Sequence, residues 1–250
     1  MRKEIKYYGI HACLSLTETR MDDVIKIYIH SSNLKSFSKA LKRCADAKKA
    51  YHIVSNEELD KISASVHHEG ICVLAKEKLP LNDKTFLKEL SHIKGNVCIL
   101  YFDGVQNPHN IGSILRSCAH FSVPFILGEK GKLPALTPSA CRIAKGGAEI
   151  VHAVEVDNPS TFLPKLIQAG FILVSTSSHA KASLYDTALP AKMVLVLGAE
   201  STGVGKAVSR HCSLHLKIPG SEAVESLNVS VATGLCLGEF YRQHMRGSAC

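Results

Sequence analysis

The segment that decides the fold is Ile218-Pro-Gly-Ser-Glu-Ala-Val-Glu-Ser-Leu-Asn-Val-Ser-Val-Ala232. Pro219 and Gly220 end an apolar strand, and Ser226 is a residue type that favours helix N-caps, so we expect a helix from 226 to about 243. One flank of this helix is apolar, and another consists of the small residues Ala232, Gly234 and Gly238. Because a glycine destabilises a helix interior by about 1 kcal/mol relative to alanine, we expect this flank to meet another backbone or a ligand at close range.

The composition is that of a globular protein with enough material for a core. Of the 250 residues, 46% are apolar, which suits one large domain or two smaller ones. No apolar run approaches the ~20 residues that span a bilayer. The first residues, Met-Arg-Lys-Glu-Ile-Lys, are not followed by the apolar stretch of a signal peptide. We therefore expect no membrane contact and no secretion.

The nine cysteines indicate a reducing compartment. They are scattered, odd in number and never spaced C-x-x-C. Most lie in apolar stretches, where a free cysteine behaves as a small hydrophobe. This pattern argues against a disulfide framework and against a zinc site. We expect a cytoplasmic protein that holds no metal.

The formal charge of +8 at pH 7 favours an anionic partner. Residues 1–76 carry 13 Lys and Arg against 9 Asp and Glu, a net charge of +4. Residues 77–250 carry 17 against 13, also +4, over more than twice the length. The N-terminal third is therefore the more densely basic part, although a basic surface is by itself more often solvated than bound to RNA.

The N-terminal third alternates short strands and helices. The residue patterns predict an entry turn into a helix over 8–16, strands at 24–29, 51–54 and 70–75, and helices at 37–47 and 56–62. Residues 77–95 are polar and lysine-rich, and they predict a linker with one short helix near 86–90. The first 76 residues therefore form a small α/β unit.

From residue 96 the alternation becomes regular. The patterns predict strands at 97–102, 124–127, 150–156, 171–174, 193–197 and 214–218, with helices at 110–120, 139–145 and 160–169. Such alternation indicates an α/β fold with a mainly parallel sheet and helices on both faces. The G-x-G-x-x-G signature of a Rossmann fold is absent after Phe102. Nicotinamide chemistry and the usual Rossmann methyltransferase are therefore poor hypotheses.

The segment Asp103-Gly-Val-Gln-Asn-Pro-His-Asn-Ile-Gly-Ser-Ile-Leu-Arg116 follows the first of these strands. Asn110 is a plausible helix N-cap. Arg116 lies four residues after Gly112, hence on the same helical face and aimed back toward the helix start. A guanidinium held there suits an RNA phosphate or ribose. The alternatives are that Asn110 only caps the helix and that Arg116 only forms a surface ion pair.

A second segment, Leu195-Val-Leu-Gly-Ala-Glu-Ser-Thr-Gly-Val204, ends another strand. Gly198 would expose main-chain donors and acceptors at the carboxyl edge of the sheet, where open α/β folds bind ligands. Glu200 could pair with Arg116 or with a substrate hydroxyl. The alternative for Glu200 is a solvated loop carboxylate.

Taken in chain order, the three quoted segments (103–116, 195–204 and 218–232) resemble the first, second and third signature motifs of the SpoU (TrmH-like) branch of the SPOUT RNA methyltransferases. The resemblance implies a C-terminal trefoil knot that holds S-adenosylmethionine, a homodimer with sites formed between two subunits, and methyl transfer to a ribose 2′-hydroxyl of RNA. Tyr8-Gly-Ile-His-Ala and His68-Glu-Gly-Ile resemble a small ribosomal-protein-like RNA-binding domain that precedes the catalytic domain in several members. The implied domains are 1–76 for RNA binding, 77–95 as linker and 96–250 for methyl transfer.

The resemblance also assigns site residues. The positions that match the family's catalytic site are Asn110, Arg116, Glu200, Ser226 and Asn228. The positions whose main chain would cradle the adenine and ribose of the cofactor are Gly198, Ile218 and Leu227. Arginine is a poor general base because its pKa exceeds ~12, so we expect Arg116 to hold the adjacent phosphate and polarise the nucleophile. Asn110, Ser226 and Asn228 are then expected to orient it.

The sequence departs from the family pattern at Gly220 and Glu222, where the third motif usually has Met and Gly. Glu222 adds charge and bulk near the cofactor loop. Our main hypothesis is a ribose 2′-O-methyltransferase acting on rRNA, with guanosine favoured, because stand-alone tRNA members generally lack the N-terminal domain. A tRNA substrate is the runner-up. A non-catalytic RNA-binding relative is the alternative from a different functional class.

Overall fold

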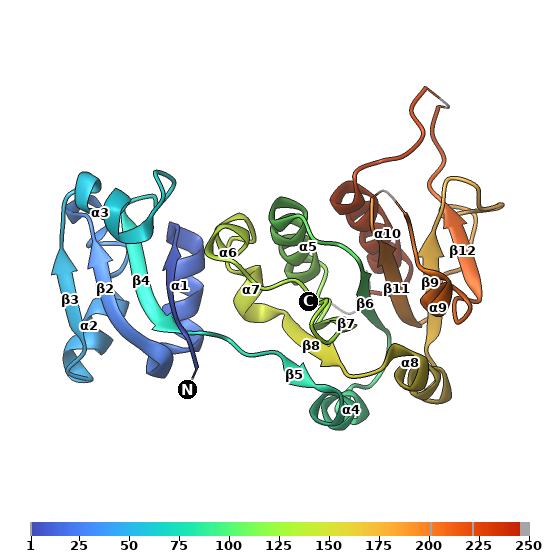
Figure 1. Cartoon of the computed structure of the whole chain (residues 1–250), viewed down its shortest axis with the longest axis horizontal. Helices are drawn as coiled ribbons and strands as arrows, with labels where there is room; N and C mark the ends of the chain where they lie inside the picture. The colour runs from blue at the N-terminus through green and yellow to red at the C-terminus, as the bar shows by residue number, and fades with distance from the viewer. Residues whose placement is uncertain (1, 201, 222, 246–250) are drawn as a thin grey trace. The chain divides into compact units, whose positions relative to one another are not determined.

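The computed structural model describes residues 2–200, 202–221 and 223–245, and its contacts divide the chain into two compact units (Figure 1). Unit 1 consists of Met1–Leu79 and Leu136–Ile150, and unit 2 of Pro80–Ala135 and Val151–Cys250. Segment 136–150, assigned from sequence to the second domain, thus packs within unit 1. The boundaries 1–76, 77–95 and 96–250 stay a prediction about domains.

Unit 1 is built on a four-stranded sheet in the order β1-β4-β2-β3. The strands are β1 (Glu4–Tyr8), β2 (Val24–Ile29), β3 (Ala50–Ile53) and β4 (Ile71–Lys76). The pair β2 and β3 is parallel, and the other pairs are antiparallel. The accompanying helices are α1 (Ile10–Thr19), α2 (Ser38–Asp46), α3 (Asn56–Ser63), α6 (Pro138–Ile143), α7 (Gly147–Ile150) and the short 3-10 turns η1 (Met21–Asp23) and η2 (Ser31–Asn33). The sequence predicted this alternation but missed β1, which pairs only with β4 at one edge of the sheet.

Ionic contacts anchor segment 136–150 inside unit 1. Arg20 Nε donates to Glu149 Oε2 at 2.7 Å, and both side chains are largely buried, with 14% and 6% of their surface exposed. Lys78 Nζ donates to the main-chain oxygens of Ala148 and Glu149, both at 2.8 Å. Because a buried charge is costly unless it is paired, these contacts specify where the segment docks.

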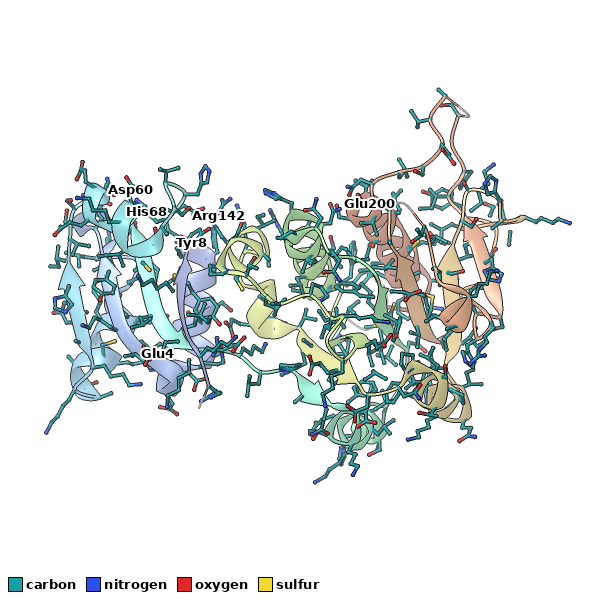
Figure 2. The ribbon with its side chains drawn as sticks, in the orientation of Figure 1. Glu4, Tyr8, Asp60, His68, Arg142 and Glu200 are labelled. Carbon is teal, nitrogen blue, oxygen red and sulfur yellow. The ribbon has the colours of Figure 1, made fainter. Side chains whose placement is uncertain are left out.

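Arg142, on α6, has an ionic partner in the same unit. Its Nη1 lies 3.6 Å from Glu69 Oε1, and its side chain crosses the backbone at Gly9 next to Tyr8 (Figure 2). Gly9 has φ of +94°, and an added Cβ would lie 2.6 Å from Arg142 Cγ. Glycine is needed there both for the backbone angle and for the space.

Unit 2 is an eight-stranded sheet in the order β10-β12-β9-β11-β6-β7-β8-β5, and every pair in it is parallel. Its strands are β5 (Leu81–Asn82), β6 (Val97–Asp103), β7 (Phe125–Glu129), β8 (His152–Val156), β9 (Ile172–Thr176), β10 (Ala182–Ser183), β11 (Lys192–Gly198) and β12 (Leu214–Lys217). Its helices are α4 (Asp83–His92), α5 (Pro108–His120), α8 (Pro159–Gln168), α9 (Lys206–Ser209) and α10 (Val229–His244). The predicted parallel α/β sheet is confirmed. The trefoil knot stays a prediction.

Strand alternation sends side chains to two helical layers (Figure 1). On one face, Val97, Ile99 and Tyr101 of β6 join a core with buried residues of α4, α8 and α9. On the other face, Cys98 is buried, as are Cys118 of α5 and Cys236 of α10. Burial raises the pKa of the Cys98 thiol, and the thiols of Cys118 and Cys236 add to this shift. Both faces of the sheet are therefore covered, as a parallel sheet requires.

The small-residue flank of α10 packs against α5 of the same chain. An added Cβ at Gly234 would lie 4.0 Å from Ser117 Oγ, and one at Gly238 would lie 3.7 Å from Phe121 Cζ. These are ordinary contact distances. The flank faces a helix of its own chain, but a Cβ would fit at both positions, so the approach is not as close as the two glycines led us to expect.

Two further observations concern the part of the chain that the structure describes. Within those ranges no helix is both long and apolar enough to cross a membrane. The same residues contain no group of three or more His, Cys, Asp or Glu side chains that could hold a metal ion.

Candidate active site

The candidate site lies at the carboxyl edge of the parallel sheet. The chain runs from β6 outward to β7 and β8, and then crosses to β9 on the other side of β11. The strand order therefore changes direction between β6 and β11. In open α/β sheets, ligands bind beyond the carboxyl ends of the strands at such a point. The loops after β6, β9, β11 and β12 all reach this edge.

Asn110 enters the site from the first turn of α5. The N-cap of this helix is Asn107, whose side chain accepts from the His109 N–H, and Pro108 occupies the first helical position. The expectation that Asn110 is the cap is therefore wrong. Proline favours the first position of a helix, and α5 begins at Pro108, so that Asn110 lies inside the first turn. Asn110 is instead buried, with 8% of its surface exposed, and its amide is free to bind other loops.

Gly198 and Glu200 come from the turn that follows β11. At Gly198 an added Cβ would lie 2.2 Å from the carbonyl carbon of Gly203, because the turn folds back over it. Reciprocal main-chain hydrogen bonds between Ala199 and Gly203 close the turn. Glu200 Oε1 accepts a hydrogen bond from Asn110 Nδ2; in Figure 2, Glu200 lies at the upper end of unit 2 near the start of α10. Its partner is thus Asn110 and not Arg116.

Asn228 brings the third motif into the same network. It caps α10, with Oδ1 accepting from the N–H and Oγ of Ser230 at 2.9 and 2.6 Å. The cap therefore lies two residues later than the predicted Ser226 cap, and α10 begins at Val229. Asn228 Nδ2 donates to Asn110 Oδ1 at 3.0 Å. The donors run in one direction from Ser230 through Asn228 and Asn110 to the carboxylate of Glu200, so both amides are held in a single orientation.

Arg116 lies outside this network. It is exposed on α5, six residues and hence about 9 Å along the axis from Asn110. It forms no hydrogen bond or ion pair with the residues that the structure describes. Its guanidinium is therefore available to an external anion.

Ser226, Ile218 and Leu227 line a neighbouring cavity of about 620 Å³ at the ends of β9 and β12 and the start of α10. The cavity has apolar and polar walls, formed by Thr176, Ser177, Ser178, His179, Tyr185, Lys217, Ile218, Pro219, Gly220, Ser221, Val224, Glu225, Ser226, Leu227, Ala232 and Leu235. Binding sites for small molecules commonly measure ~300–1,000 Å³ and combine apolar walls with a few polar groups. These residues fit a nucleoside-sized ligand. Gly198 is not among them, and Glu222 lies outside the described residues.

Two features of the site were not predicted. Asp103 Oδ2 accepts from the Gly205 N–H at 2.7 Å and so ties the end of β6 to the turn after β11. Thr176-Ser-Ser-His179, which begins with the last residue of β9, forms one wall of the cavity. A run of small polar residues after a buried strand was the available signal for this wall.

Comparison with known families decides what this arrangement is. Residues 97–238 match the SpoU rRNA Methylase family, and residues 7–81 match the family described as RNA 2′-O ribose methyltransferase substrate binding. The chain belongs to the SpoU rRNA methylase family. It is an RNA 2′-O-ribose methyltransferase.

Relatives in the SpoU family align along nearly the whole chain. The 23S rRNA (guanosine-2′-O-)-methyltransferase RlmB of Pasteurella multocida is 33% identical over 95% of this chain and 98% of its own length. YfiF of Escherichia coli O157:H7, named as an uncharacterized tRNA/rRNA methyltransferase, is 39% identical over 97% of this chain and 69% of its own.

Solved structures share the fold. The SpoU methyltransferase AviRb from Streptomyces viridochromogenes, in complex with AdoMet, superposes with a TM-score of 0.76 at 20% identity, covering 98% of this chain and 92% of that one. The TrmH/SpoU tRNA modifying enzyme of A. aeolicus gives a TM-score of 0.53 at 29% identity and covers 64% of this chain and 83% of its own.

Proposed function

We propose that this chain methylates the 2′-hydroxyl of a guanosine in 23S rRNA. The observation that carries the proposal is the extent of similarity. The RlmB protein of P. multocida, named for that reaction, aligns with 95% of this chain and 98% of itself. The A. aeolicus tRNA modifying enzyme aligns with only 64% of this chain. A tRNA substrate is the second candidate, since the name of the E. coli relative includes tRNA.

The cavity beside α10 would hold the cofactor. Its apolar residues Ile218, Leu227 and Leu235 suit an adenine ring, and the main chain at Ile218 and Leu227 offers hydrogen-bonding groups. Gly198 keeps the turn after β11 folded close to its own strand. When bound, S-adenosylmethionine supplies a methyl group activated by the positive sulfur.

The asparagine network would position the ribose. Transfer forms a bond between the ribose 2′-oxygen and the methyl carbon and breaks the bond between that carbon and the donor sulfur, which leaves as a neutral thioether. The hydroxyl gives up one proton. Glu200 accepts from Asn110 through Oε1, is exposed, and so has its second oxygen available to a substrate hydroxyl. We assign the proton to this carboxylate, because an arginine side chain stays protonated in proteins and cannot act as the base. Arg116 holds the phosphate next to the reacting ribose.

A homodimer in the cytoplasm completes the proposal. Three apolar side chains next to the cavity are exposed, Val224 at 67%, Leu227 at 46% and Val231 at 51%. Apolar side chains gathered on one surface commonly mark an interaction site. Sedimentation equilibrium tests this point, with a dimer expected and a monomer at all concentrations contradicting it.

The test of substrate choice uses RNA from a strain that lacks the gene. The purified protein is incubated with labelled S-adenosylmethionine and either 23S rRNA or bulk tRNA, and the methylated nucleoside is identified. We expect label in 2′-O-methylguanosine of 23S rRNA. Label confined to tRNA supports the second candidate. The absence of transfer to either RNA, together with retained RNA binding, supports a non-catalytic relative.

A further inference from the structure

Unit 1 has a sheet face that α3 covers only in part. Two rows of residues cross it from β1 through β4 and β2 to β3. The first row consists of Tyr8, Cys72, Tyr28 and His52, and the second of Lys6, Leu74, Lys26 and Ala50. Helix α3 packs on β1 and β4, and accordingly Tyr8 and Cys72 are buried. In the second row Lys6 and Ala50 are exposed, while Leu74 and Lys26 are half-buried.

A stacked pair of rings stands at the edge of this face. The rings of Tyr28 and His52 lie 5.7 Å apart between centroids, with 21° between their planes. The ammonium of Lys26 lies 5.8 Å from the Tyr28 centroid. In the part of the chain that the structure describes, β3 is the edge strand of this sheet, and His52 is exposed. The ring face of His52 turned away from Tyr28 is therefore accessible to a flat ligand.

The charges on this face are positive and unpaired. Lys6, Lys26 and Lys76 form no ion pair with any of the residues 2–200, 202–221 and 223–245. Glu4 lies opposite Lys76 in the register of β1 and β4, which leaves three positive charges against one negative. An anion that also carries flat rings satisfies both features of the surface.

We propose that this lysine–aromatic face, formed by Lys6, Lys26, Tyr28, His52, Leu74 and Lys76, binds unpaired nucleotides of the substrate RNA. A base stacks on the free face of His52, and backbone phosphates lie against the lysines. Proteins that bind single-stranded RNA combine stacking rings with a basic surface in this way, and stacking tolerates any base. The inference rests on the proposed function only in taking RNA as the partner.

The variant His52→Ala tests the stacking. Fluorescence anisotropy of the full-length protein compares a short single-stranded RNA oligomer with the same sequence in a duplex. We expect His52→Ala to bind the single strand about 10-fold more weakly and the duplex almost unchanged. The matched control is Tyr51→Ala, since Tyr51 precedes His52 on β3, is 44% exposed and points to the opposite face. Equal affinities for His52→Ala and Tyr51→Ala would overturn the proposal, as would an equal loss for the duplex.

Charge reversal tests the lysines. We expect Lys26→Glu to weaken binding to the single strand and to reduce the dependence of affinity on salt concentration by about one counterion. An unchanged salt dependence contradicts a phosphate contact. These binding assays need neither cofactor nor turnover. An inactive wild-type protein would therefore refute the proposed function alone, whereas an active one with no effect of His52→Ala on RNA affinity or KM would refute this inference alone.

Discussion

Asn228 Nδ2 donates a hydrogen bond of 3.0 Å to Asn110 Oδ1, and this bond joins the starts of α10 and α5 across 118 residues of sequence. Asn110 in turn donates a hydrogen bond through Nδ2 to Glu200 Oε1 in the turn after β11. Asparagine suits the central position because one side chain must both accept and donate. Three loops of a parallel sheet are thereby set at fixed positions before any substrate binds.

We expect Asn110→Asp to disable the site while leaving the fold intact. An aspartate cannot donate to Glu200, and two carboxylates in contact repel each other. Loss of a preorganised polar group commonly lowers kcat by about 100-fold or more. Steady-state methyl transfer measures this loss, with Ser117→Ala, farther along α5, as control. A kcat within a factor of two of the wild-type value would show that the network is not part of the site.

The turn after β11 should not tolerate a side chain at Gly198. In Gly198→Ala the new Cβ would lie 2.2 Å from the Gly203 carbonyl carbon, so the turn must move. Forced displacement of this kind costs about 1–3 kcal/mol. We expect weaker binding of S-adenosylmethionine by calorimetry. Gly238→Ala is the control, because a Cβ there would lie at an ordinary contact distance, 3.7 Å from Phe121 Cζ, and Gly238 does not line the cavity. Equal affinities for the two variants contradict the assignment.

Arg116 should matter for reaction and not for stability. It is exposed and has no partner among the described residues, so Arg116→Ala should change the free energy of unfolding by no more than about 0.5 kcal/mol. Methyl transfer should nevertheless be lost. Arg116→Lys should restore little, because an ammonium does not reproduce bidentate contact with a phosphate. Full activity of the alanine variant would remove Arg116 from the mechanism.

The buried ion pair between Arg20 and Glu149 should stabilise unit 1. Arg20→Met leaves the carboxylate of Glu149, 6% exposed, without its partner. Removing one member of a buried pair costs about 3 kcal/mol or more. Urea unfolding measures the change, and the double variant Arg20→Met/Glu149→Met should be less destabilised than Arg20→Met alone. An undisturbed midpoint in the single variant would show that segment 136–150 docks without this pair.

Alkaline pH should destabilise the protein through its thiols. Burial raises the pKa of Cys236 and of Cys141 to about 12, whereas an unfolded thiol titrates near 8.5. Between these values the unfolded state has lost a proton that the native state keeps, so stability falls as pH rises, by roughly 1.4 kcal/mol per pH unit for each such thiol. Urea unfolding from pH 8.5 to 10.5 measures the slope. Cys236→Ala should show a shallower slope, and an identical slope would contradict the buried assignment.

Sequence periodicity predicted most of the fold because long buried strands leave a continuous apolar signal, as in β6 and β11. The two-residue strands β5 and β10 carry too few residues for such a signal. The helix starts were misplaced by two or three residues, since Asn107 and Asn228 compete as caps with Asn110 and Ser226. The docking of segment 136–150 in unit 1 depends on pairs such as Arg20 and Glu149, which lie 129 residues apart. No local pattern contains that information.

The same reasoning applies to the site. Motif resemblance selected Asn110, Glu200 and Asn228, which the structure joins by hydrogen bonds. It left open an ion pair between Arg116 and Glu200, but Glu200 bonds to Asn110 and Arg116 has no partner among the described residues. Ring stacking between Tyr28 and His52 escaped prediction because it depends on the parallel register of β2 and β3, which the sequence does not encode locally.

The most direct test of the account follows a labelled methyl group from S-adenosylmethionine to RNA. Wild-type protein and Arg116→Ala are incubated with rRNA from a strain lacking the gene, and the RNA is digested to nucleosides. We predict label on the ribose 2′-oxygen with the wild type and none with the variant. Label on a base, or equal incorporation by both proteins, would contradict the account.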